Sequence, residues 1–192
     1  MTQPDRFISL GRTCEVAFHI RRRLGLERAY PFDWWITPLS AIAPLLRSGF
    51  DLDISRDNLM VPDERNTVIN KRWQIRHHHD FPRKSRKIVP NWASHIDTVR
   101  AKYQRRGARF LEALNTTDRI TFMISQNEDD TAESAAHLDD ICAAIGHLAP
   151  RLDFRLVAFR FAHAGTDRRV STPGVNDYGD RSRTRHATTR NR

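Results

Sequence analysis

Short apolar runs alternate with amphipathic helical patterns along this chain, and that alternation limits the folds it can adopt. The apolar runs have the length of buried strands and lie at residues 7–10, 120–124 and 154–161. The helical patterns, with apolar residues three and four positions apart, lie at residues 14–24, 38–48, 91–114 and 131–148. Strands that alternate with helices favour a parallel sheet. The sequence therefore predicts the α/β class, a layered sandwich with a largely parallel central sheet.

Two further stretches complete this prediction. Residues 73–81 alternate between the two sides of a strand, which places His77, His79 and Phe81 together on its inward face. Residues 51–72 carry many charges and little periodicity, which is typical of an irregular connection with a short strand pair.

Boundary residues mark the first two helices. Thr13 is the expected N-cap of the first, and Gly25 is its left-handed stop. Thr37 is the expected N-cap of the second, with Pro38 in the first helical position. Pro44 inside that pattern predicts a kink or a shorter helix.

The length of 192 residues fits one domain, which we expect to span residues 1–162. Residues 163–192 contain almost no large apolar side chain, and we expect a disordered basic tail there. The tail holds seven arginines and three aspartates, so it carries +4 of the formal net charge of +9. Such a tail suits non-specific contact with nucleic acid. The arginines of the body are not interleaved with aromatic residues as in a base-stacking surface, so nucleic acid is not its expected partner.

Two cysteines, Cys14 and Cys142, are too few for a disulfide framework, and the residues before Arg6 lack the pattern of a signal peptide. We therefore expect a cytoplasmic protein that does not enter a membrane. The sequence has neither a HExxH nor a CxxC pattern, and we expect no metal and no cofactor.

The loops that leave the carboxyl ends of parallel strands meet at one edge of a sheet, where ligands usually bind. In this sequence those loops lie at residues 11–14, 79–81, 126–128 and 162–163. They would bring together the Cys14 thiol, the His79 imidazole and the Asn127 amide. This convergence is the main physical argument for a site.

Cys14 would lie in the first turn of a helix, where unsatisfied N–H groups and the helix dipole lower the pKa of a thiol. A thiolate in that position is a competent nucleophile. The alternative is an inert cysteine packed under the turn, because cysteine is among the most buried residue types. Cys142 lies on the apolar stripe of its helix and is expected in the core.

His79, next but one to Phe81, suits a general base because the pKa of histidine is easily tuned across neutrality. A hydrogen-bonded core histidine explains the pattern equally well, and His78 is more simply a solvated neighbour. A metal held by His77, His79 and Asp33 is a third reading. Two imidazoles with no further ligand at a set spacing are, however, a weak zinc pattern.

Asp33 stands between Phe32 and Trp34, and an acid in such apolar surroundings must be paired or functional. It could orient an imidazole or cap the backbone of its own loop.

Four pieces of the chain fall in a distinctive order within residues 6–161: Ser9-Leu10-Gly11-Arg12-Thr13-Cys14, Tyr30-Pro31-Phe32-Asp33-Trp34, His79-Asp80-Phe81, and Tyr103-Gln104-Arg105-Arg106 leading to Arg109-Phe110. Together they resemble a bacterial domain family of unknown function described as papain-like cysteine peptidases. The resemblance implies Cys14 as nucleophile and His79 as its base, with Asp33 or Asn127 orienting the histidine. It also implies an alternative α+β papain-like fold, in which the cysteine helix packs on an antiparallel sheet that carries the histidine.

These observations predict a cysteine-dependent hydrolase or acyl transferase whose substrate has a carbonyl or anionic group. Backbone N–H groups from Thr13 to Glu15 would hold the oxyanion, while Gly11, Arg12, Thr13 and Asp80 would bind the ligand. The alternative is a non-catalytic domain that binds a phosphate or carboxylate at the helix N-terminus after Gly11.

Overall fold

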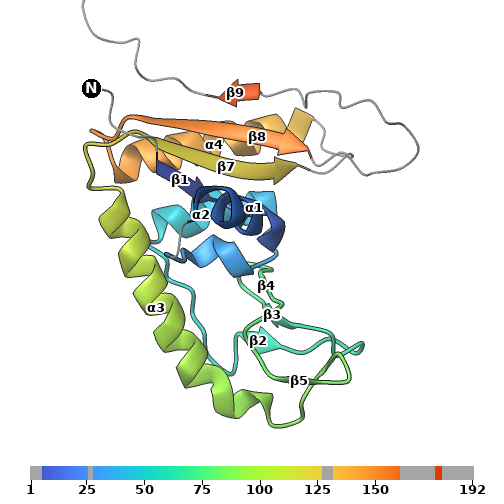
Figure 1. Ribbon diagram of the computed structural model, residues 1–192. Helices are drawn as coiled ribbons and strands as arrows, with labels where there is room; N and C mark the ends of the chain where they lie inside the picture. Colours follow the sequence, from blue (N-terminus) through green and yellow to red (C-terminus); the bar gives the residue numbers. More distant parts are fainter. Residues whose placement is uncertain (1–5, 26–27, 127–131, 161–175, 179–192) are drawn as a thin grey trace, which may run out of the picture.

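The computed structural model describes residues 6–25, 28–126, 132–160 and 176–178 (Figure 1). The α-helices are α1 (Cys14–Leu24), α2 (Leu39–Arg47), α3 (Ile96–Ala113) and α4 (Ala132–Leu148), and the 3₁₀ helices are η1 (Pro31–Trp34) and η2 (Trp92–His95). The strands are β1 (Arg6–Ser9), β2 (Leu59–Met60), β3 (Val68–Asn70), β4 (Arg76–His77), β5 (Arg83–Lys84), β6 (Lys87–Ile88), β7 (Ile120–Gln126), β8 (Phe154–Arg160) and β9 (Asn176–Tyr178).

A parallel sheet contains the first and the last strand that the structure describes, β1 and β9. Its order is β1-β7-β8-β9, and β1, β7 and β8 run parallel. The central strand β7 buries Ile120, Phe122 and Ile124, as its continuous apolar run predicts. Figure 1 shows α4 lying along β7 and β8. The coarse prediction of mixed helices and strands around a parallel sheet is therefore confirmed.

The predicted strand at residues 73–81 is wrong in length, partner and orientation. Only β4 is extended there, and it pairs antiparallel with β3 in the separate sheet β2-β3-β4. Gln74 adopts a left-handed conformation (φ 54°), and the chain turns again directly after His77. His77 is fully buried whereas His79 is exposed, so the two do not share an inward face. Period-two hydrophobicity cannot reveal a turn of this kind, because it records only which side chains are apolar.

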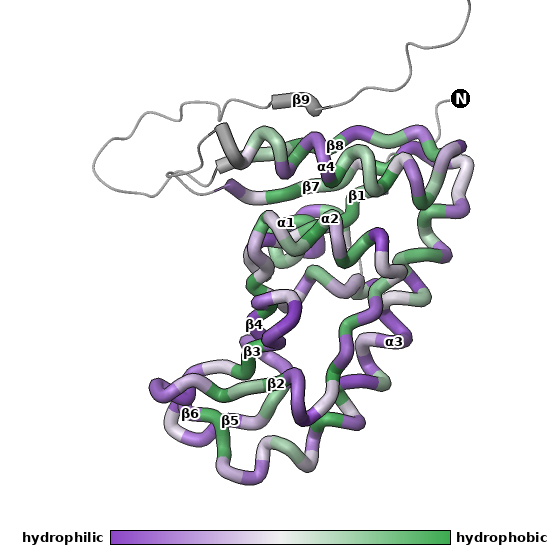
Figure 2. The backbone as a smooth tube through the Cα atoms, turned by 180° about the vertical axis from the view of Figure 1, so that it is seen from behind, coloured by the Kyte–Doolittle hydropathy of each residue, from purple (hydrophilic) through white to green (hydrophobic). Residues whose placement is uncertain are grey.

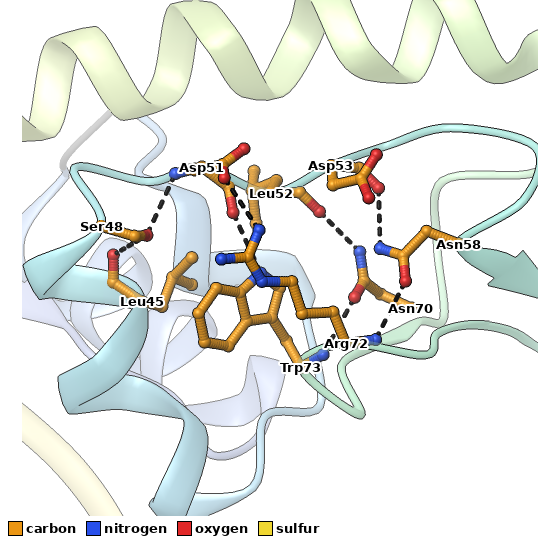
Figure 3. A network of polar contacts seen from close by, with 9 residues as sticks. All are labelled: Leu45, Ser48, Asp51, Leu52, Asp53, Asn58, Asn70, Arg72 and Trp73. Atoms are coloured by element: carbon orange, nitrogen blue, oxygen red, sulfur yellow. Dashed lines mark hydrogen bonds and ion pairs between the residues drawn. The ribbon is translucent and has the colours of Figure 1, made fainter.

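A polar network holds the irregular connection between α2 and β4, where the short strand pair β2 and β3 is present as predicted (Figure 3). The buried Asn70 side chain is its centre. Its Nδ2 donates to the Leu52 carbonyl at 2.7 Å, and its Oδ1 accepts from the Trp73 N–H at 3.0 Å. At the surface, Arg72 pairs with Asp51 and stacks on the Trp73 ring. This network gives order to a segment with little regular secondary structure.

The helix boundaries follow the sequence in part. Gly25 is left-handed (φ 64°) and its N–H donates to the Arg21 carbonyl at 2.8 Å, as predicted. Thr13, in contrast, makes no side-chain cap, and its buried hydroxyl has no hydrogen-bond partner among the described residues. Pro38 rather than Thr37 caps α2, which ends after nine residues with Pro44 inside it.

The helix α3 joins the two parts of the fold, since it runs from the parallel sheet to the small sheets (Figure 1). It alternates between hydrophilic and hydrophobic residues (Figure 2) and buries Val99, Tyr103 and Phe110. Together with η2 it covers the predicted helical range 91–114. Tyr103 stacks on Trp35 with ring centroids 4.4 Å apart, and Gly107 leaves room for Phe50, which an added Cβ would approach to 3.3 Å.

β9 lies within residues 163–192, where a disordered tail is the prediction, and it pairs antiparallel with β8. The other residues of that stretch lie outside the described part of the chain, and the domain boundary at residue 162 stays a prediction. Across the ranges that the structure describes, no helix combines the length and the apolar character that a bilayer crossing requires.

Replacing Asn70 tests the polar network. Asn70→Ala leaves the Leu52 carbonyl and the Trp73 N–H without their partner, and we expect it to lower the free energy of unfolding by about 1–3 kcal/mol. Asp51→Asn removes only an exposed ion pair and should cost less than about 1 kcal/mol. Urea unfolding measures both variants. Equal losses for the two would contradict a central role for Asn70.

Candidate active site

The structure brings a thiol and an imidazole together from distant parts of the chain. The Cys14 Sγ and His79 Nε2 atoms are 3.7 Å apart, although 65 positions separate the residues. Cys14 is the first residue of α1, and His79 lies in the turn after β4. Sulfur is larger than oxygen, and catalytic contacts are often longer without a substrate, so this distance is compatible with proton transfer.

The loop that presents Cys14 is held on both sides by backbone hydrogen bonds. The Ser125 N–H of β7 donates to the Gly11 carbonyl at 3.0 Å, and the Thr37 N–H donates to the Arg12 carbonyl at 2.9 Å. Gly11 has φ 90°, a left-handed value that favours glycine at this turn. The loop after β1 is thereby fixed where α1 begins with Cys14.

The turn that presents His79 is connected to the segment that also holds the Cys14 loop. An isolated antiparallel bridge joins Ile36 to Arg76, with N–O distances of 3.1 and 2.9 Å. The Trp34 ring then packs edge-on against the His79 ring, with centroids 5.7 Å apart. The sequence predicts that His79 reaches Cys14 from the edge of the parallel sheet. In the structure it comes instead from the turn after β4, a strand of the antiparallel sheet β2-β3-β4.

Burial raises the pKa of the Cys14 thiol above its ordinary value. The N–H of Cys14 itself lowers it, but less strongly, and the Glu15 carboxylate raises it further. The prediction of a thiol pKa lowered at the helix N-terminus is therefore wrong. The half-buried position of the sulfur and the neighbouring carboxylate outweigh the favourable backbone. A thiol of this kind needs a base beside it to become a nucleophile, and His79 occupies that place.

Asp33 caps its own loop and does not orient His79. Its Oδ2 accepts from the Tyr30 N–H at 2.9 Å and from the Arg21 guanidinium at 3.1 Å. Burial raises the pKa of this carboxyl, while the Tyr30 N–H and Arg21 oppose the rise. The alternative of a backbone cap is the one that the structure shows.

Asp80 is not placed to bind a ligand, contrary to the prediction. Its side chain is 0% exposed. Oδ2 accepts from the Tyr103 hydroxyl at 2.7 Å and lies 2.9 Å from His77 Nδ1, and Oδ1 forms an ion pair with Lys102. Burial alone would raise its pKa, but His77 and Lys102 together lower the pKa to about 2. Asp80 is a buried structural anion beneath the site.

The structure places the other predicted residues as follows. Gly11, Arg12 and Thr13 lie in the loop that directly precedes Cys14. Asn127 lies outside the described residues, one position after the end of β7. Within the described ranges His77 and Asp33 are each bonded to other groups, and no three potential ligands gather, so the set of His77, His79 and Asp33 is not assembled there. Cys142 is partly buried against the core, as expected.

Sequence reasoning missed three contributors. Trp34 packs on His79, and Lys102 with Tyr103 holds Asp80. Tyr103 has the spacing of a core residue in a helix, which it also is. No local signal connects it with Asp80, from which it lies 23 positions away.

Comparison with known proteins identifies the relatives of this chain. Residues 5–164 match a family described as "Putative papain-like cysteine peptidase". The chain belongs to this family. The "Uncharacterized protein R408" of Acanthamoeba polyphaga mimivirus is 25% identical over 167 residues, which cover 76% of this chain and 73% of the viral protein. No solved structure matches significantly. Family membership agrees with the Cys14 and His79 pair, while a bacterial source stays a prediction.

Acid titration tests the buried carboxylate of this family member. The pKa of Asp80 is lowered from 3.8 to about 2 in the folded chain, so its ionised form stabilises the fold above about pH 4. That contribution, about 2 kcal/mol, is lost as the pH falls towards 2. Urea unfolding between pH 5 and pH 2.5 should therefore show a steeper loss of stability for the wild type than for Asp80→Asn. Parallel losses would contradict an ionised, paired Asp80.

Proposed function

We propose that this protein is a peptidase-like cysteine hydrolase or acyl transferase, with Cys14 as the nucleophile and His79 as the general base. The contact of 3.7 Å between Sγ and Nε2 carries the proposal. It places the two groups in the relation that nucleophilic catalysis needs, and family membership independently names a cysteine peptidase chemistry.

In the first step the Cys14 sulfur attacks the carbonyl carbon of the substrate, and the thiol proton passes to His79 Nε2. The carbon–sulfur bond forms while the carbonyl oxygen becomes an oxyanion. When this intermediate collapses, the bond to the leaving group breaks and the leaving group takes the proton from His79. Water then attacks the acyl thioester, His79 again accepts a proton, and the thiol returns to Cys14.

The oxyanion would be stabilised by backbone N–H groups between Thr13 and Glu15. The first N–H groups of a helix have no acceptor within the helix, and they meet the positive end of its dipole. Cys14 begins α1, so these donors lie beside the sulfur. Gly11 and Arg12 would contact the substrate from the preceding loop.

The orientation of the imidazole is a separate part of the proposal. Asn127 remains the proposed orienting residue, because Gln126 ends β7 next to the Gly11 loop. Trp34 supports one side of the ring. The two cysteines are thiols and not a disulfide, which fits a reducing cytoplasmic setting. The substrate would carry a carbonyl group, and contacts of the basic tail with nucleic acid would be non-specific.

A thiol-directed affinity probe tests this proposal. A peptidyl vinyl sulfone, followed by peptide mass spectrometry, should modify Cys14 at least tenfold faster than Cys142, because His79 lies beside the Cys14 sulfur and can accept its proton. Cys142 serves as the internal control in the same sample. His79→Ala should reduce labelling of Cys14 by about a hundredfold, and Cys14→Ser should abolish it at that position.

Two outcomes would overturn the proposal. One is a Cys14 that reacts no faster than Cys142, and the other is labelling that does not depend on His79. The non-catalytic alternative predicts instead that phosphate raises the melting temperature of the wild type and of Cys14→Ser equally.

A further inference from the structure

The turn that carries His79 is fastened to the core by the residues on either side of it. His77, at the end of β4, has a fully buried ring that packs against Trp35, Phe81 and Tyr103. Asp80, directly after His79, has a side chain that is 0% exposed. The chain therefore enters and leaves the turn through buried anchors, and the two histidines between them lie toward the surface.

The two anchors are bonded to each other and to α3. His77 Nδ1 and Asp80 Oδ2 are 2.9 Å apart, which closes the turn on itself. The Tyr103 hydroxyl donates to the same oxygen at 2.7 Å, and Lys102 forms an ion pair with the other oxygen. Three donors on one buried carboxylate make a strong, geometrically restricted contact. Lys102 also balances the charge, without which a buried anion would be costly.

His79 itself has few direct restraints. Its Nε2 faces Cys14, and within the described residues no group hydrogen-bonds its Nδ1. In the described part of the chain, ring contacts with Trp34 and His78 flank it. The backbone of the turn, whose position depends on Asp80, therefore contributes to the direction of its Nε2.

We propose that Asp80 is a positioning residue: clamped by Lys102 and Tyr103 of α3, it holds the turn so that His79 Nε2 faces the Cys14 sulfur. This inference rests on the proposed function, since it assigns a role within the same thiol and imidazole pair. It differs from a third catalytic residue, because Asp80 acts through the backbone and does not contact the imidazole or the substrate.

The geometry favours positioning over a merely stabilising role. An ion pair placed only for stability need not adjoin a functional residue, whereas Asp80 is next to His79 in sequence and its buried side chain is bonded to His77 at the other end of the same turn. Small errors in such a position are costly, because a displacement of about 1 Å of a catalytic group can reduce a rate about a hundredfold.

The test measures alkylation of Cys14 by iodoacetamide from pH 5 to pH 9. In this reaction the sulfur forms a bond to the methylene carbon, iodide leaves, and the thiol proton passes through His79 to solvent. Tyr103→Phe removes one bond to Asp80 but keeps the ring that stacks on Trp35. Lys102→Met removes the ion pair. Arg105→Met is the matched control, since it removes an exposed cation from the same helix.

We expect Tyr103→Phe and Lys102→Met to slow alkylation of Cys14 at pH 6 by about tenfold, and to shift the pH profile towards that of His79→Ala. Arg105→Met should match the wild type, and the Cys142 peptide should react equally in all samples. Glu15 acts on Cys14, His78 adjoins His79, and Arg83 lies beside His78; all three are unchanged in every variant. The melting temperature of each variant shows that the folded protein is being measured.

The outcomes separate the inference from the function on which it rests. If the variants lower the melting temperature but leave the pH profile of Cys14 unchanged while His79→Ala alters it, Asp80 only stabilises the fold and the inference fails. If His79→Ala itself leaves the profile unchanged, the thiol and imidazole pair fails, and the inference with it. If Lys102→Met does not fold, Tyr103→Phe decides the question alone, because it preserves the packing of the ring.

Discussion

Two adjacent backbone N–H groups connect the halves of the candidate site. The Ile36 N–H donates to Arg76, at the strand that leads to His79, and the Thr37 N–H donates to Arg12, in the loop that leads to Cys14. Because the consecutive residues Ile36 and Thr37 make these bonds, they hold the loop before Cys14 and the strand before His79 in a fixed relation to each other. The distance between sulfur and imidazole therefore depends on a short, well-bonded segment and not on how the two sheets happen to lie. Trp34 and Trp35 immediately before it pack on His79 and His77, which strengthens the same connection.

Sequence patterns predict this fold where local signals and long-range packing agree. The helices α1 and α4 and the strands β7 and β8 have continuous periodicity and clear ends, and each is present close to its predicted bounds. Residues 73–81 show the opposite case. Their alternation of apolar residues is real, since Ile75, His77 and Phe81 are buried, but a left-handed residue and a tight turn interrupt the strand. Backbone conformation of that kind depends on hydrogen bonds with distant residues, and no hydrophobic pattern encodes it.

The candidate site also has a part that the sequence predicts and a part that it does not. Cys14 and His79 are predictable, because one follows a glycine turn at a helix start and the other belongs to a recognisable group of short sequence pieces. The elements that bring Cys14 and His79 together nevertheless differ from those predicted. His79 comes from an antiparallel sheet, which is the arrangement that the papain-like alternative implies for the histidine. The predicted roles of Asp33 and Asp80 also differ from what the structure shows. Asp33 forms an ion pair with Arg21, and Asp80 forms one with Lys102, partners that the fold brings near.

The structure shifts the pKa values of Cys14 and Asp80 in opposite directions. Burial raises the pKa of the Cys14 thiol, so the thiolate forms less readily there and depends more on a neighbouring base. The pKa of Asp80 is lowered to about 2, so the permanent negative charge of the region lies one layer deeper and is already paired with Lys102. A thiol that depends on a neighbouring base requires that base in the right place before the attack. In the proposed mechanism that requirement falls on the turn between His77 and Asp80, so the activity that we propose for the thiol would depend on a carboxylate that does not contact the substrate.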